Sequence, residues 1–397
     1  MTNAPLPPLL YRGSAKDVLA AGPGQAPYIF AFTDRYSVFD WGEMPDRLPD
    51  KGRSLCLCGA IMFALLAEAD GWRDWIPPAT LAGSPALARL RTHGLRHHMR
   101  SALDANAMPV DVLTAPDRVD RYLAVEPVDV LWPSEVITDG ALSWSYAAYQ
   151  DRPVNALVPL EIIFRFGAPA GSSVFERLGD PAYRATSGLD TSPQPGALFL
   201  APIIEFSTKL EPTDRYLTRS EAQSLAGLTA AEMSALTDWA TLLAWRLHAL
   251  FSAVALQLWD GKIECSFVAS TDGIPDDPRD FMLVDSIGPD ELRLTHAGQS
   301  LSKQNLRGCY LGTPWKAAVD RAKALAQARG VADWQAICRD ELGATPPPLT
   351  AADVQRYGDM YRSIVYALAH KHLGRAVFQD CPDLATISRS LAPDFQS

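Results

Sequence analysis

The sequence of 397 residues lacks the features of membrane-spanning and exported proteins. No apolar run reaches the roughly 20 residues that cross a bilayer, because the longest candidates are interrupted by Arg246, His248 and Gln257. The segment that starts at Met1 has neither a basic flank nor an apolar signal core. These absences predict a cytoplasmic protein without a membrane partner.

The chain is also poor in cysteine and has no excess of positive charge. Its six cysteines include one Cys-x-Cys pair, Cys56 and Cys58, and no second pair follows at zinc spacing, so neither a disulfide framework nor a structural zinc site is expected. His97 and His98 have no carboxylate or cysteine partners at ligand spacing and are predicted to lie on the surface. The formal net charge of −10 argues against a broad nucleic-acid-binding surface.

What is present is the composition of an ordinary globular protein. Hydrophobic residues make up 48% and charged residues 21% of the chain, enough apolar side chain for a sizeable core. The length predicts two domains or one large two-lobed unit. We place the boundary near Asn155, which gives an amino-terminal lobe of residues 1–155, a second lobe of residues 156–310 and a helical extension of residues 311–397.

Short apolar runs bounded by turn residues predict an antiparallel meander at residues 9–11, 12–19 and 28–32. Residues 157–166 are expected to form a buried strand, 119–130 are strand-like, and 133–153 have the composition of a loop. Helical spacing indicates helices at 54–69, with Ser54 as N-cap and Gly71 just past the end, and at 85–95, 174–178, 315–328 and 351–370. Capping boxes at Thr218–Glu221 and Thr229–Glu232 predict two further helix starts.

A pair of charged strands is the most informative stretch. Asp260, Lys262 and Glu264 are spaced at i, i+2 and i+4, so a strand places all three side chains on one face. The turn-rich residues 271–278 would return the chain as a second strand that ends at Asp285. Carboxylates beside a lysine can hold a divalent cation and a phosphate, although a solvated strand face with a cross-strand ion pair has the same pattern.

Two glycine-containing segments are candidates for phosphate binding. Gly13-Ser14-Ala15-Lys16 lies between two strands, where backbone N–H groups and a lysine can fold over phosphates; an ordinary hairpin is the alternative. Arg165 leaves a buried strand and is followed by Gly171-Ser172-Ser173 at a helix start. An arginine and a helix N-terminus together favour a phosphate site.

Six ordered motifs resemble those of the SAICAR synthetase family, the phosphoribosylaminoimidazole-succinocarboxamide synthases. They lie at residues 11–16, at 33–40 (Thr-Asp-Arg-Tyr-Ser-Val-Phe-Asp), at 49–52 (Pro-Asp-Lys-Gly), at 158–172 (Val-Pro-x-Glu, Arg, Gly-Ser), at 260–264 (Asp-x-Lys-x-Glu) and at 285–293 (Asp, Pro-Asp, Arg). Each motif is weak alone, but their common order argues against chance agreement.

This resemblance implies an α+β fold with two lobes, related to the ATP-grasp and protein-kinase architecture, in which antiparallel sheets carry flanking helices and ATP and Mg²⁺ bind between the lobes. The residues it implies are, for ATP, Gly13, Ser14, Lys16 and Lys209; for the metal, Glu264 and Asp285; for catalysis, Asp260 and Lys262; and for the substrates, Asp40, Arg165, Ser172, Asp214, Arg293, Lys303 and Arg307.

The implied reaction is an ATP-dependent ligation with small-molecule substrates. It joins L-aspartate to the carboxylate of carboxyaminoimidazole ribonucleotide through an acyl phosphate, giving SAICAR in purine biosynthesis. The chain departs from the family pattern at Ser14, Phe166, Ser286 and His296. A relative that ligates a different carboxylate and amine, and a non-catalytic nucleotide-binding protein, are therefore alternatives. Homo-oligomerisation and the roles of residues 72–155 and 311–397 are left open.

Overall fold

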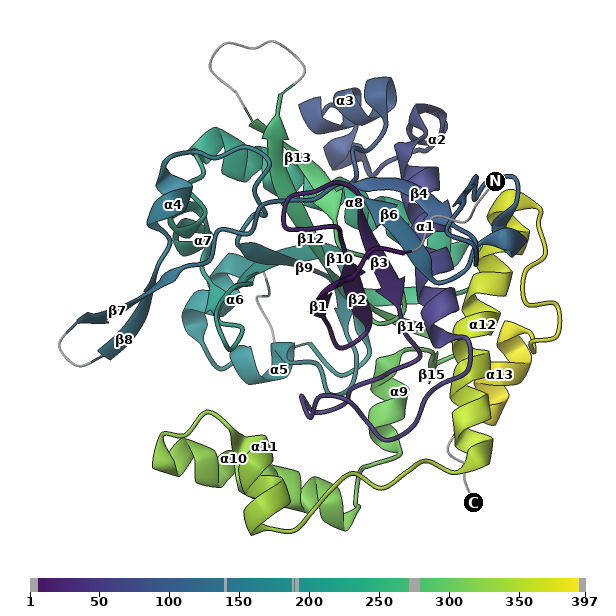
Figure 1. The fold of residues 1–397 in the computed structure, drawn as a ribbon. Coiled ribbons are helices and arrows are strands. Elements are labelled where there is room, and N and C mark those ends of the chain that lie inside the picture. The colour runs from purple at the N-terminus through teal and green to yellow at the C-terminus, as the bar shows by residue number, and fades with distance from the viewer. Residues whose placement is uncertain (1–5, 139–140, 188, 190–192, 271–278, 393–397) are drawn as a thin grey trace.

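The computed structural model describes residues 6–138, 141–187, 189, 193–270 and 279–392. Within them, antiparallel sheets are flanked by helices (Figure 1), which confirms the predicted α+β class. No helix in this part of the chain is long and apolar enough to cross a membrane. The division into residues 1–155, 156–310 and 311–397 stays a prediction.

The first sheet contains the predicted meander, extended by strands from further along the chain. Its spatial order is β1-β2-β3-β6-β4-β5. The strands are β1 (Leu9–Arg12), β2 (Lys16–Leu19), β3 (Tyr28–Phe32), β4 (Met99–Leu103), β5 (Pro109–Val110) and β6 (Tyr122–Val125).

The second sheet is built around the two strands that carry most of the charged motifs. Its order is β11-β10-β9-β12-β14-β15, and β13 pairs separately with β12. The strands are β9 (Leu160–Ala168), β10 (Ala197–Thr208), β11 (Tyr216–Leu217), β12 (Gln257–Ala269), β13 (Arg279–Val284), β14 (Leu292–His296) and β15 (Gln299–Ser300). The antiparallel pairing of β12 with β13 confirms the predicted strand pair, whereas the predicted turn at 271–278 lies outside the described residues.

Helices cover the sheets and form most of the carboxyl-terminal part. They are α1 (Lys51–Ala67), α2 (Ala69–Arg73), α3 (Pro85–His93), α4 (Ala147–Gln150), α5 (Val174–Arg177), α6 (Pro181–Ser187), α7 (Arg219–Leu225), α8 (Ala230–Ser252), α9 (Lys303–Gly308), α10 (Pro314–Arg329), α11 (Trp334–Ala336), α12 (Ala351–Leu373) and α13 (Leu384–Ser390). Short 3-10 helices occur at η1 (Ala79–Leu81) and η2 (Pro116–Arg118), and a π-helical turn occurs at η3 (Ile337–Glu341). The predicted helices at 85–95, 315–328 and 351–370 are confirmed, as are both capping boxes, which open α7 and α8.

The helix α1 is buried on nearly every side, because its sequence has no polar face. It packs against β3, β4 and β6 on one side and against α12 on the other (Figure 1). Helix α8 packs against β9, β10 and β12 of the second sheet. The carboxyl-terminal helix α12 thus becomes part of the core beneath the first sheet, whereas α10 and α11 lie away from the sheets.

The predicted start and end of the first long helix are wrong. Helix α1 begins at Lys51, and Ser54 lies buried in its first turn. An acceptor from outside the helix explains the early start, since Asp34 Oδ1 accepts a hydrogen bond from the backbone N–H of Gly52 at 2.9 Å. Gly71 does not follow the helix end but lies within the next helix, α2.

The prediction of a loop at residues 133–153 is also wrong. The segment forms a hairpin of β7 (Ser134–Thr138) and β8 (Ala141–Ser145), followed by α4. The hairpin projects from the body of the molecule (Figure 1), and apolar residues such as Ile137 and Leu142 are exposed. Trp144 is partly buried against the core, and residues 142–145 (Leu-Ser-Trp-Ser) alternate apolar and polar side chains as a strand does, a signal that the loop prediction did not use.

Candidate active site

A cavity of about 610 Å³ lies between the two large sheets. One part of its wall is apolar and is formed by Val18, Tyr28, Phe30, Val125, Val128, Leu157, Leu210 and Val284. The other part is charged and is formed by Lys16, Lys209, Lys262, Glu264, Asp285, Asp290, Glu291 and Lys303. Gly13 and Ser14 also line it, so eight of the residues implied by the sequence resemblance meet in this cavity: Gly13, Ser14, Lys16, Lys209, Lys262, Glu264, Asp285 and Lys303.

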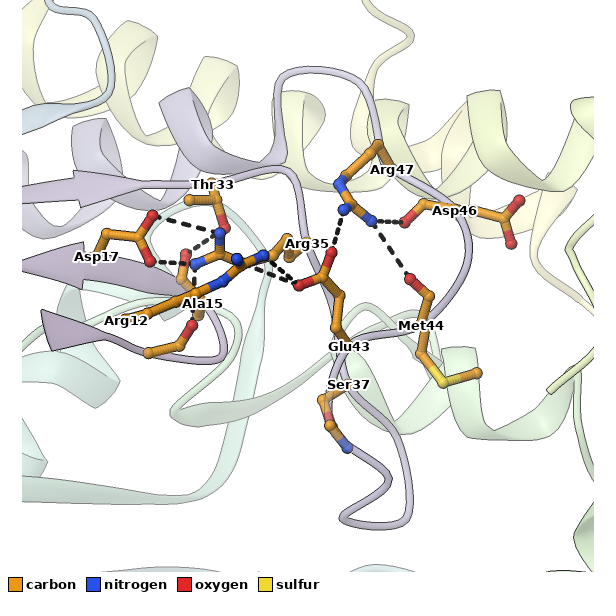
Figure 2. Close-up of polar contacts among 12 residues, drawn as sticks. Arg12, Ala15, Asp17, Thr33, Arg35, Ser37, Glu43, Met44, Asp46 and Arg47 are labelled. Carbon is orange, nitrogen blue, oxygen red and sulfur yellow. Dashed lines mark hydrogen bonds and ion pairs between the residues drawn. The ribbon is translucent and has the colours of Figure 1, made fainter. Parts of the chain in front are cut away.

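The loop between β1 and β2 is held in place by the motif at residues 33–40, as Figure 2 shows. The Thr33 backbone N–H and hydroxyl both donate to the Ala15 carbonyl at 2.9 Å. The Arg35 guanidinium donates to the Gly13 carbonyl at 2.9 Å and forms an ion pair with Asp17. Arg35 itself is buried, so this motif fixes the loop that presents Lys16 to the cavity.

Two lysines pair with the two carboxylates that were predicted to bind metal. Lys16 Nζ lies 2.6 Å from Asp285 Oδ1, and Lys209 Nζ lies 2.7 Å from Glu264 Oε1. Burial and the charge of Asp285 raise the pKa of Glu264. Burial opposes ionisation of Asp285 as well, but Lys16 outweighs it and lowers the pKa of that carboxyl. The charges of Glu264 and Asp285 therefore repel each other. Two carboxylates this close together could be ligands of one cation.

Glu161 links two of the lysines. It is the glutamate of the Val-Pro-x-Glu motif, but no binding or catalytic role was predicted for it. Its Oε1 accepts from Lys262 Nζ at 2.7 Å and from Lys209 Nζ at 3.2 Å. Burial opposes the charged form of Lys262, but Glu161 outweighs it and raises the pKa of the ammonium. Glu161 comes from β9 and is buried. The signal in the sequence was a second charged residue, besides Arg165, within an apolar strand.

The prediction that His98 lies on the surface is wrong. Its ring is buried, and Nε2 lies 3.0 Å from the Asp285 carbonyl. Burial lowers the pKa of His98 to about 4, so the ring is neutral near pH 7. Asp285 has a φ of 67°, an uncommon conformation for a residue with a side chain. The histidine therefore supports a strained turn, a role that residue spacing along the chain does not indicate.

Glu291 is a further acidic residue of the cavity that the motifs did not single out. Its Oε1 accepts a hydrogen bond from the Ser286 hydroxyl at 3.1 Å, and Lys16 Nζ lies 3.5 Å from the same hydroxyl oxygen. Its buried Oε2 has no hydrogen-bond partner among the described residues. Burial, with the nearby charge of Asp290, raises the pKa of Glu291 to about 7.

A second group of predicted residues forms an alternating row of charges across the second sheet. Asp260 Oδ2 lies 3.3 Å from Arg165 Nη1 and 3.4 Å from Arg293 Nη1. Arg165 Nε lies 2.5 Å from Glu205 Oε2, and Glu205 Oε1 lies 2.7 Å from Arg177 Nη1. Glu205 and Arg177 were not predicted. Three arginines and two carboxylates leave one positive charge, and Arg293 Nη1 is buried without a hydrogen-bond partner among the described residues.

The other implied substrate residues do not line the cavity. Ser172 is buried at the start of α5, where its Oγ accepts from the Val174 backbone N–H at 3.4 Å. Asp40 is exposed and forms an ion pair with Lys323 of α10 at 3.0 Å. Asp214 is exposed too. Protein atoms nevertheless exclude part of the water around its carboxyl, and this desolvation, together with the charge of Glu161, raises the pKa of Asp214. Burial lowers the pKa of Arg307, which Asp40 partly offsets.

The fold and this cavity define an α+β protein with a cleft, part apolar and part charged, between two antiparallel sheets. A family model described as SAICAR synthetase matches residues 9–113 and 150–322. This match covers more than half of the chain and includes every implied site residue. The chain belongs to the SAICAR synthetase family and is a ligase of that purine-biosynthesis family.

Individual relatives agree with this assignment. An Archaeoglobus fulgidus protein, provisionally named phosphoribosylaminoimidazole-succinocarboxamide synthase, is 32% identical over 383 residues, which are 96% of this chain and 98% of that protein. A Thermoplasma volcanium protein with the same enzyme name is 26% identical over 281 residues, which are 70% of this chain and 72% of its own. The structure of SAICAR-synthase from Saccharomyces cerevisiae complexed with SAICAR has a TM-score of 0.55 at 18% identity, covering 94% of this chain and 96% of that one. That likeness shows the fold.

Proposed function

We propose that the protein joins L-aspartate to the carboxylate of carboxyaminoimidazole ribonucleotide, using ATP and Mg²⁺, to give SAICAR. The γ-phosphoryl group passes to the carboxylate, forming an acyl phosphate and ADP. The amino group of aspartate then attacks the acyl carbon, so that an amide forms and phosphate leaves. The observation that carries the proposal is one cavity in which an apolar wall adjoins four lysines and the pair Glu264 and Asp285.

The two parts of the cavity suit the two parts of a nucleotide. The apolar wall, with the aromatic rings of Tyr28 and Phe30, is suited to a base, and the lysines are suited to phosphates. Lys16 and Lys209 come from different sheets and converge on the carboxylate pair. In phosphoryl transfer, catalysis depends mostly on positioning and on stabilisation of charge. We assign these two lysines to the phosphates of ATP.

The residues present fit a magnesium ion. Within the described residues, no three His, Cys, Asp or Glu side chains form a ready metal-binding group. Mg²⁺ usually takes one or two carboxylates and completes its shell with water and nucleotide phosphates, and Glu264 with Asp285 provides that number. When bound, the ion supplies neutralisation of the charge that develops on the transferring phosphoryl group. Glu264 and Asp285 would hold it, in competition with Lys209 and Lys16.

Lys262 is assigned to the reacting carboxylate. Its ammonium is held by Glu161 at 2.7 Å, and its side chain is 45% exposed, so it can reach a substrate while its orientation is fixed. Asp260 has a different position, because its contacts are to Arg165 and Arg293. We assign the two arginines, with Ser172, to the ribose phosphate, and Lys303, Arg307, Asp214 and Asp40 to the aspartate side.

Two departures from the family pattern lie away from the substrates. Phe166 is buried against Trp245, with ring centroids 4.8 Å apart, on the face of β9 that packs on α8. His296 Nδ1 lies 3.0 Å from the Ser388 hydroxyl in α13. Both residues therefore serve packing. Ser14 and Ser286 line the cavity, so the alternative, ligation of a different carboxylate and amine, rests on these two positions.

The test is phosphate release from ATP–Mg²⁺ with carboxyaminoimidazole ribonucleotide, measured with and without L-aspartate. We expect release that requires both substrates and a succinocarboxamide product identified by mass. ATP binding without turnover of this pair would contradict the proposed substrates and would favour another carboxylate and amine.

A further inference from the structure

The carboxylate of Glu205 is shared between two arginines in the interior of the second sheet. Arg165 Nε approaches its Oε2 at 2.5 Å. Arg177 approaches both oxygens, with Nη1 at 2.7 Å from Oε1 and Nη2 at 2.9 Å from Oε2. Glu205 is buried. The contact at Oε1 is an ion pair without a hydrogen bond among the described residues. Burial opposes ionisation of Glu205, but the hydrogen bond from Arg177 and the charge of Arg165 outweigh it and lower the pKa, so the carboxylate is ionised at neutral pH.

Arg177 is itself held rigidly by two aromatic rings. Its guanidinium carbon lies 3.8 Å from the ring centroid of Tyr216 and 4.3 Å from that of Tyr183. A guanidinium stacked on aromatic faces keeps its plane fixed while its edge forms a bidentate contact with a carboxylate. The Tyr216 hydroxyl also accepts a hydrogen bond from Arg165 Nη2 at 3.0 Å. Arg177 and Tyr216 thus enclose the same side of Arg165.

Arg165 is consequently restrained at two edges of its guanidinium. Glu205 binds Nε, and Asp260 binds Nη1 at 3.3 Å. Asp260 also binds Arg293, so the two arginines share one carboxylate oxygen. A phosphate monoester needs cations in a fixed geometry, because bidentate recognition is lost when the guanidinium plane turns. The extra positive charge of the row is then available to the phosphate.

We infer that Glu205 and Arg177 are positioning residues for the phosphate-binding arginines. Glu205 fixes the plane of Arg165 from the side opposite Asp260, and Arg177 keeps Glu205 from rotating away. Neither residue touches the substrate, and their effect is confined to recognition of the phosphate group. This inference rests on the proposed assignment of Arg165 and Arg293 to the ribose phosphate.

The experiment compares two probes that differ by the phosphate, aminoimidazole carboxamide ribonucleotide and its nucleoside. Binding of each is measured by calorimetry on the full chain. Glu205→Gln keeps the size of the side chain but removes its charge, and we expect the dissociation constant for the ribonucleotide to rise about tenfold, the factor that corresponds to one charge-assisted hydrogen bond. Binding of the nucleoside and of ATP should not change. In turnover with the substrate itself, KM for carboxyaminoimidazole ribonucleotide should rise while kcat stays within about twofold.

Arg177→Lys provides a second, milder variant, because it keeps the charge and removes the fork and the stacking. Arg177→Lys should weaken binding of the ribonucleotide but not of the nucleoside, and its dissociation constant for the ribonucleotide should rise less than that of Glu205→Gln. Arg118→Ala is the matched control: this exposed arginine pairs with Asp104 at 3.3 Å and has no part in the row, so both probes should bind as to the wild type. Unchanged ribonucleotide binding in both Glu205→Gln and Arg177→Lys, or equal losses for ribonucleotide and nucleoside, would overturn the inference.

Arg165→Met separates this inference from the proposed function. If Arg165→Met binds the ribonucleotide as tightly as the wild type, the phosphate assignment itself fails. If Arg165→Met loses the ribonucleotide while Glu205→Gln and Arg177→Lys keep it, the assignment stands and the positioning role alone fails.

Discussion

Lys16 Nζ lies 2.6 Å from Asp285 Oδ1, so a lysine assigned to ATP phosphates is ion-paired with a carboxylate assigned to the metal. Lys209 and Glu264 form the second such pair, at 2.7 Å. A divalent cation that binds these carboxylates competes with the two ammonium groups. Phosphates accept the displaced lysines, so nucleotide and cation should each favour the binding of the other.

Replacing Lys16 tests this competition. Lys16→Met removes the ammonium but keeps an unbranched side chain, so the variant should bind Mn²⁺ more tightly than the wild type when nucleotide is omitted. KM for ATP should rise about 10- to 100-fold, since a hydrogen bond to a charged group contributes about 1.5–3 kcal/mol. Mn²⁺ binding is measured by electron paramagnetic resonance and KM by phosphate release. Weaker Mn²⁺ binding without nucleotide would contradict the competition.

Lys262 should be required for ligation and not for folding. Its side chain is 45% exposed and contacts Glu161, so Lys262→Ala removes little buried surface. We expect the melting temperature to stay within about 2 °C of the wild type, since exposed substitutions change stability by about 0.5 kcal/mol or less, while product formation falls below detection. Lys371→Ala, an exposed lysine on α12, is the control and should keep full activity. Wild-type turnover in Lys262→Ala would remove this residue from the site.

The start of α1 should tolerate no side chain at Gly52. A Cβ atom there would lie 2.7 Å from the Phe32 carbonyl oxygen and 2.9 Å from the Thr33 carbonyl carbon, both rigid backbone atoms. Gly52→Ala should therefore destabilise the protein by about 1–3 kcal/mol, the usual cost of overpacking. Gly83→Ala is the matched control, because a Cβ atom at that position meets no atom within 4 Å. Thermal unfolding of both variants measures the difference. Equal melting temperatures would show that the start of α1 can move away from Phe32 and Thr33 without loss of stability.

The parts of the site that the sequence predicts are those that depend on local spacing. Strand period two brought Lys262 and Glu264 to one face, and the capping boxes opened α7 and α8. Contacts between distant segments had no such signal. Asp34 binds the N-terminus of α1, and His98 reaches the Asp285 carbonyl from 187 residues away. The β7–β8 hairpin was missed although residues 142–145 alternate apolar and polar side chains, because the strands are short and exposed apolar residues such as Ile137 do not face a core.

Glu205 shows the same limit within the proposed phosphate site. Its partners Arg165 and Arg177 lie 40 and 28 residues away along the chain, so the charged strand position alone did not reveal that one carboxylate serves two arginines. The prediction of a buried strand that carries Arg165 is confirmed, since β9 is buried along its whole length, although the strand continues past Arg165 to Ala168. The register of β9 against β10 and β12 decides which charges meet, and that register is set by tertiary packing.

Glu291 should make stability depend on pH. Burial raises its pKa to about 7 in the folded protein from an ordinary value of 4.5. Between these two pH values the folded protein holds a proton that the unfolded chain has lost. Its contribution to stability is therefore complete below about pH 4.5 and is lost as the pH rises through about 7. The deprotonated carboxylate would have one buried oxygen without a hydrogen-bond partner among the described residues.

Glu291→Gln removes this dependence because the amide does not ionise. Its melting temperature, measured relative to the wild type by calorimetry, should be similar to or below that of the wild type near pH 5, should gain on it up to about pH 7 and should then level off. Other groups that titrate in this range cancel in the comparison, since both proteins contain them. Glu68→Gln replaces an exposed acid at the end of α1 and should follow the wild type at every pH. A constant difference between Glu291→Gln and the wild type from pH 5 to pH 8 would show that Glu291 does not titrate in this range in the folded protein and would contradict a pKa of about 7.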